Sequence, residues 1–188
     1  MEIATKITLI AVACSIVIAL NNFFSLKDRL INFLRKRLGV QSEQEKLNQE
    51  KRQSDRELYK QITSYLNSEG NMMEIRDAHF GGLFRDDLTE DLRDFMWKCK
   101  NPDFEFHNKK IEKEKRNLEN SLSTFLSAVG QHTFTYDPNP DFRCIPKDWR
   151  HRLPEKYHSA TKALNSSADS TVEAYDAFIR KCKKELAL

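Results

Sequence analysis

The first positions of the chain form a continuous apolar run. Ile7 to Leu20 contains fourteen residues without a charge, and only Thr8 and Ser15 are weakly polar. A membrane-spanning helix needs roughly 20 residues to cross about 30 Å of hydrocarbon. The stretch Ile3–Phe24 reaches that length because the long side chain of Lys6 can extend toward the interface. The pattern therefore predicts a transmembrane helix over residues 1–24.

Two other interpretations of this run are weaker. A cleaved signal peptide would end in small residues at an A-x-A site, but here the run ends in Asn-Asn-Phe-Phe at 21–24. A lipoprotein would be modified at Cys14, yet the apolar run continues beyond it through Leu20.

Small residues at four-residue spacing in the run favour close approach of two helices in lipid and predict self-association. They are Ala11, Ser15 and Ala19.

The next segment, residues 25–40, changes to a helical alternation of apolar and basic positions. The apolar residues follow i, i+4, i+7, i+8 and i+12 spacing and are Leu26, Leu30, Phe33, Leu34 and Leu38. The bases between them are Lys27, Arg29, Arg35, Lys36 and Arg37, against the single acid Asp28, so the segment carries +5 − 1 = +4. The pattern predicts a basic amphipathic helix on an anionic membrane surface. Packing of its apolar face on the body of the protein remains the alternative.

The same charges predict the orientation. Positively charged flanks stay in the cytoplasm, and only Lys6 precedes the apolar run. We therefore expect a single-pass protein of the inner (plasma) membrane, with the N-terminus outside and the C-terminal domain in the cytoplasm.

Beyond residue 40 the pattern indicates a polar stalk followed by a helical bundle. Residues 42–57 hold one large apolar residue, Leu47, among good helix formers. We expect a solvated helix there, continuous with a bundle over 58–188. A coiled coil is the alternative for this polar helix, but its a/d repeat does not last three heptads. Within the bundle, Asn101 and Pro102 predict the start of a long helix, Gly130 its end, and residues 165–167 a break before the last helix. That helix has a 3-4 stripe formed by Val172, Tyr175, Ile179, Cys182 and Leu186.

The predicted fold is therefore all-α, with one irregular Pro-rich stretch over 131–153. Thr133–Tyr136 alternates as a short strand does, and residues 137–140 (DPNP) predict a turn. The whole chain carries +3 and residues 1–24 are neutral, since Glu2 offsets Lys6, so residues 41–188 sum to 3 − 4 = −1. This balance argues against nucleic acid as a partner. The four cysteines contain no C-x-x-C pair, so zinc or redox chemistry is not indicated.

No catalytic constellation is evident. The five histidines lack the spacing of metal ligands, and no phosphate-binding or nucleophile-elbow motif occurs. The carboxylates at Asp86, Glu90 and Asp94 share one helix face and could bind a divalent cation, but they also fit a solvated face. We therefore expect no enzymatic activity, no cofactor and no metal.

The densest mixture of aromatic, basic and proline residues lies over 142–157. Because Trp and Arg dominate binding hot spots, its candidate partner-binding residues are Arg143, Trp149, Arg150 and Arg152. The alternative is that Trp149 plugs one end of the bundle.

These observations favour a membrane-tethered cytosolic helical interaction module whose partners are membrane lipid and an unknown protein. The alternative is a membrane-perturbing effector, pore-forming or depolarising, of a bacterial toxin or phage-defence system. An enzyme acting on lipid or nucleotide is a third possibility.

Overall fold

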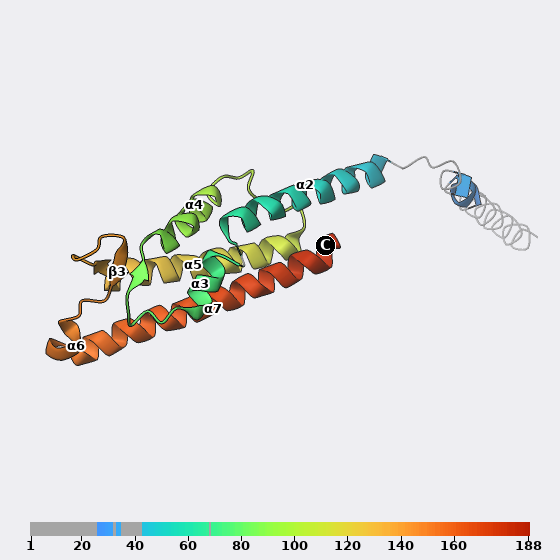
Figure 1. Cartoon of the computed structure of the whole chain (residues 1–188). Helices are drawn as coiled ribbons and strands as arrows, with labels where there is room; N and C mark the ends of the chain where they lie inside the picture. The colour runs from blue at the N-terminus through green and yellow to red at the C-terminus, as the bar shows by residue number, and fades with distance from the viewer. Residues whose placement is uncertain (1–25, 32, 35–42, 68) are drawn as a thin grey trace, which may run out of the picture. The chain divides into compact units, whose positions relative to one another are not determined.

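Helices account for most of the structure, a computed structural model that describes residues 26–31, 33–34, 43–67 and 69–188 (Figure 1). This confirms the coarse prediction of a helical protein. The chain divides into two units, Met1–Glu50 and Lys51–Leu188. The second unit contains the hydrophobic core.

In the first unit, residues 26–31 and 33–34 are helical, as expected from their apolar spacing. Leu26, Leu30 and Phe33 are 60% or more exposed, at 67%, 60% and 60%. Among the described residues, no helix combines the length and apolarity that a membrane crossing requires. The predicted transmembrane helix over 1–24 lies outside the described residues, so it stays a prediction.

The helices are α2 (Glu43–Tyr65), α3 (Asn71–Asp77), α4 (Glu90–Lys98), α5 (Lys109–His132), α6 (Trp149–Arg152) and α7 (Pro154–Leu186), with a 3₁₀ turn η1 (Asp87–Thr89) before α4. The long helices α5 and α7 lie side by side and make the most extensive contact between elements (Figure 1). α4 packs on α5, and α3 packs on α7. The core lies between these helices, and Phe80 joins it by edge-to-face contacts with Phe84 and Phe125 at centroid distances of 5.0 and 5.2 Å.

Helix α2 confirms that the polar segment runs without a break into the apolar one. Residues 43–54 are exposed, as predicted for a stalk, and Leu58 and Ile62 are buried. Asp55, two residues before the predicted boundary at 57, is already only 3% exposed. Arg56 also donates to the carbonyl of Leu186 at 2.8 Å. The last turn of the polar segment therefore docks on the bundle.

The predicted limits of the long helix α5 are wrong at both ends. Its N-cap is Asn108, whose side chain accepts from the backbone N–H of Lys110 at 3.0 Å. Asn101 instead closes a local turn by accepting from the N–H of Asp103. At the other end the helix continues past Gly130 to His132, and the hydroxyl of Thr133 donates to Val129 O at 2.7 Å.

The predicted break at residues 165–167 does not occur, because α7 is continuous from Pro154 to Leu186. Pro154 occupies the first turn, where its missing N–H costs no hydrogen bond. The polar side chains in the middle of α7 form hydrogen bonds that leave the helix intact. Ser167 donates to Leu164 O at 3.0 Å, and Asn165 accepts from the N–H of Phe80 at 3.0 Å. The interior of the helix thus tolerates residues that usually favour turns.

A small antiparallel sheet is the main addition to the predicted all-α fold. Its order is β1-β3-β2, with β1 at Phe84–Arg85, β2 at Phe134–Thr135 and β3 at Phe142–Cys144. β2 lies within the predicted strand over 133–136. The turn predicted at 137–140 connects β2 to β3, where Asn139 donates to Tyr136 O at 2.9 Å. The irregular Pro-rich stretch therefore contains two of the three strands.

Candidate interaction surface

The structure separates the four candidate partner-binding residues into two places. Arg143 lies on the central strand β3 and is 18% exposed at its side chain. Its guanidinium donates to Thr133 Oγ1 at 3.0 Å, to Thr133 O at 3.1 Å and to Asp86 Oδ1 at 3.2 Å. These contacts join β3 to the segments on both sides of it. Arg143 is thus engaged within the fold.

Trp149 opens α6 and lies between β2 and α7. Its ring packs edge-to-face on Phe134 at a centroid distance of 6.2 Å. From the other side, Lys156 Nζ lies 3.7 Å from the ring centroid, within the range of a cation–π interaction. Trp149 also contacts the edge of the core. The indole is therefore held in place from β2 and from α7.

Around this tryptophan, apolar and basic side chains face solvent. Phe134 is 53% exposed and Leu153 is 47% exposed. Arg150 and Arg152 are exposed on α6, and Arg152 lies 3.7 Å from Asp148 in a pair that is mostly in water, which contributes little. We call this set the aromatic–basic surface; it consists of Phe134, Trp149, Arg150, Arg152, Leu153 and Lys156.

The sequence interpretation found three of these six residues and missed the rest. Phe134 was assigned to a strand, but only its pairing opposite Cys144 places it next to Trp149. The alternation of Thr133–Tyr136 gave no signal for this, since it would turn the apolar Phe134 inward, whereas both residues of β2 are exposed. Lys156 lies in the stretch 142–157, but helical spacing could not place it beside Arg152, because the non-helical Leu153 separates α6 from α7.

The other candidate residues fall mainly outside the described part of the chain. Lys27 and Arg29 are exposed on the helical residues 26–31. The remaining predicted membrane-surface residues, Arg35, Lys36 and Arg37, lie outside the described residues. So do the candidate self-association residues, Ala11, Ser15 and Ala19.

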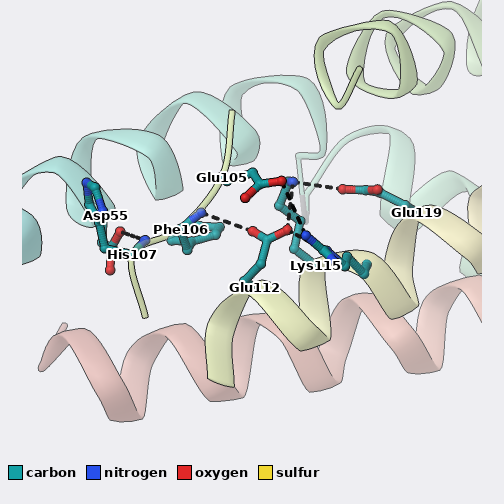
Figure 2. A network of polar contacts seen from close by, with 8 residues as sticks. Asp55, Glu105, Phe106, His107, Glu112, Lys115 and Glu119 are labelled. Carbon is teal, nitrogen blue, oxygen red and sulfur yellow. Dashed lines mark hydrogen bonds and ion pairs between the residues drawn. The ribbon is translucent and has the colours of Figure 1, made fainter. Parts of the chain in front are cut away.

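A buried polar network that the sequence did not reveal fixes the segment before α5 (Figure 2). Lys115 is 1% exposed, and its Nζ lies 2.8 Å from Glu119 Oε1 and 3.5 Å from Glu112 Oε1. Glu112, 4% exposed, also accepts from the N–H of Phe106 at 3.0 Å and from Arg116 Nε at 2.9 Å. Pairing is required here because an isolated buried charge would be strongly destabilising.

Asp55 extends this network from α2. Its two carboxylate oxygens accept from the backbone N–H groups of His107 and Asn108 at 2.7 and 3.0 Å. A carboxylate at that place also faces the positive end of the α5 dipole. The network thus connects α2, the 104–108 segment and α5, and we assign it a structural role.

The thiols near the core are not activated. Burial, reinforced by the Glu119 carboxylate, raises the pKa of Cys99 far above its usual range. Burial also raises the pKa of Cys182 to about 12. A thiol is nucleophilic as the thiolate, so both cysteines remain protonated near neutral pH and act as small packed residues.

Of the three carboxylates considered for cation binding, Asp86 has a partner within the fold, as does the neighbouring Asp87. Asp86 pairs with Arg143 at 3.2 Å, and Asp87 pairs with Arg85, whose hydrogen bond lowers the pKa of that carboxyl. Within the described ranges, no group of three or more His, Cys, Asp or Glu side chains is arranged to hold a metal ion.

Fold and surface together define a class: a helical bundle with a short sheet and an exposed aromatic–basic surface at one end. No protein-family model, curated protein or solved structure matches the chain.

Proposed function

We propose that the chain is a membrane-tethered helical interaction module, and that the aromatic–basic surface is its contact with a partner protein. The observation that carries this proposal is the exposure of Phe134 and Leu153 beside Trp149 and the α6 arginines. Trp and Arg contribute most to binding hot spots, and a pre-positioned indole loses little conformational entropy on binding.

The tether is supported by the sequence. The apolar run over 7–20 and the +4 charge of residues 25–40 are typical of a single span whose following domain is cytoplasmic. The exposed apolar side chains of Leu26, Leu30 and Phe33, beside Lys27 and Arg29, fit contact with an anionic leaflet. A reporter that is active only outside the cytoplasm, fused after Leu188, should be inactive. Its activity would refute this orientation.

Site-specific photo-crosslinking in cells tests the contact surface. A photoreactive residue at Phe134 or Arg150 in the full chain should give a discrete adduct. The same residue at Glu173, exposed on α7, is the matched control and should give none. Reversing the charge at Arg150 and Arg152 should reduce the Phe134 adduct severalfold, because the basic side chains would no longer attract an acidic partner.

Two results would overturn the proposal. One is the absence of adducts from both Phe134 and Arg150 while the chain is present at the membrane. The other is equal adduct formation from Glu173, because that would indicate random encounters rather than a defined surface.

A further inference from the structure

A second surface of the same unit is acidic and apolar. An open groove runs between α3, β1 and η1, and its lining includes Glu69, Met73, Glu74, Asp77, Leu83 and Phe84; we call it the acidic groove. Met73 and Leu83 are 50% and 45% exposed there. The one base in the lining, Arg85, is paired with Asp87. The groove therefore presents more carboxylates than basic groups around its apolar side chains.

The aromatic–basic surface is its complement in charge. It presents Arg150, Arg152 and Lys156 around the exposed Phe134 and Leu153. Apolar side chains surrounded by opposite charges on two faces favour contact between those faces, since the apolar groups leave water and the charges pair at the rim.

The sheet supplies a second, independent observation. In the order β1-β3-β2, the described strands leave β1 and β2 each paired on one side only. β1 contributes Phe84 and Arg85 to the acidic groove, and β2 contributes Phe134 to the aromatic–basic surface. Unpaired strand edges are templates for pairing with another chain. The two complementary surfaces thus each contain one open edge of the same sheet.

We propose that a second copy of this chain is the occupant of the acidic groove, and that it docks there through its aromatic–basic surface. This inference rests on the proposed role of that surface as a contact face and names its partner. Because the two contacting surfaces differ, the contact is heterologous. Each copy in a pair can then retain a free surface for a further copy. Tethering at the membrane raises the effective concentration and promotes the contact.

Cysteine crosslinking between two differently tagged full-length chains tests the docking. Met73→Cys in one chain and Leu153→Cys in the other should be joined by a short bis-maleimide. The control pair combines Leu153→Cys with Glu173→Cys and should not be joined. The native Cys99, Cys144 and Cys182 are intermediate or buried, and each single-cysteine chain mixed with the unsubstituted chain controls for them and for Cys14.

Charge reversal separates this contact from any association through the membrane segment. Arg150→Glu with Arg152→Glu should lower the 73–153 crosslink roughly tenfold, since two attractions become repulsions. Glu74→Lys with Asp77→Lys should do the same. Mixing the two reversed chains, or combining the four changes in one chain, should restore the crosslink, which also shows that the variants are folded.

The outcomes distinguish this inference from the proposed function. A 73–153 crosslink that is lost on either reversal and restored by the combination supports self-docking. No 73–153 crosslink, a crosslink insensitive to reversal, or equal crosslinking of the control pair overturns it. If self-docking fails while photo-crosslinking from Phe134 still gives a charge-dependent adduct of another mass, the proposed function survives and only the partner assigned here is wrong.

Discussion

Replacing Asp55 with alanine tests whether the polar end of α2 stabilises the bundle. The change removes the acceptor of two backbone N–H groups, those of His107 and Asn108, at 2.7 and 3.0 Å. A hydrogen bond to a charged group contributes about 1.5–3 kcal/mol. Water can replace part of this because His107 is exposed. We therefore expect the free energy of unfolding to fall by about 2–4 kcal/mol.

Two further variants test whether the loss of these hydrogen bonds causes the destabilisation. Asp55→Asn retains one acceptor oxygen and should cost roughly half as much. Glu57→Ala is the matched control two residues along α2, because Glu57 is exposed and pairs with Gln53 and Lys60 on its own helix. Exposed substitutions of this kind change stability by about 0.5 kcal/mol or less.

Urea unfolding of the full chain in mild detergent, followed by tryptophan fluorescence and circular dichroism, provides the measurement. With a denaturant slope of roughly 2 kcal/mol/M, the midpoint of Asp55→Ala should fall by roughly 1–2 M, whereas that of Glu57→Ala should hardly move. Amide exchange at His107 and Asn108 should accelerate in the Asp55 variants alone. Equal midpoints for Asp55→Ala and Glu57→Ala would refute the reasoning, and the polar end of α2 would then be a free stalk.

The buried thiols, a buried phenylalanine and an exposed helical glycine give the remaining predictions. Because the pKa of folded Cys182 is raised to about 12 whereas an unfolded cysteine ionises near about 8.5, stability should decline as pH rises above about 8.5. Iodoacetamide should label Cys182 and Cys99 only as urea unfolds the protein, and rapid labelling of the native state would contradict this. Phe178 is 0% exposed, so Phe178→Ala should lower the free energy of unfolding by about 3–5 kcal/mol in urea. Phe134 is 53% exposed, so Phe134→Ala should lower it far less. Similar losses for the two variants would contradict the assignment of Phe178 to the core. Gly130→Ala should raise the free energy of unfolding by about 0.4–1 kcal/mol, since an added Cβ meets nothing within 4 Å inside α5. If the variant is destabilised instead, α5 ends at Gly130, as the sequence predicted.

The candidate site shows where sequence interpretation reached its limit. Trp149 and its neighbouring arginines were found because their composition is unusual within a few residues. Arg143 belongs to the same stretch, yet strand pairing turns it toward Thr133 and Asp86. Phe134 joined the surface only through the sheet. The acidic groove was not predicted, since its lining comes from α3, β1 and η1 and includes Phe142 of β3, and nothing local indicates which of these segments meet.

The sequence by itself determined the local features of the bundle. The 3-4 spacing of Tyr175, Cys182 and Leu186 predicted the buried face of α7, where these residues are 2%, 0% and 3% exposed, because helical periodicity depends only on residues within a few turns. The turn at 137–140 was likewise specified by its own prolines and asparagine.

Only the tertiary structure decided the features that depend on distant partners. Lys115 looks like a solvated lysine in sequence, but Glu112 and Glu119 allow it to be buried. Asn165 resembles a helix breaker, but its side-chain oxygen accepts from the backbone N–H of Phe80, eighty-five residues earlier in the chain. The physical reason is the same in both cases. A polar side chain is satisfied by whichever group lies within about 3 Å, and the fold, rather than the neighbouring sequence, places that group.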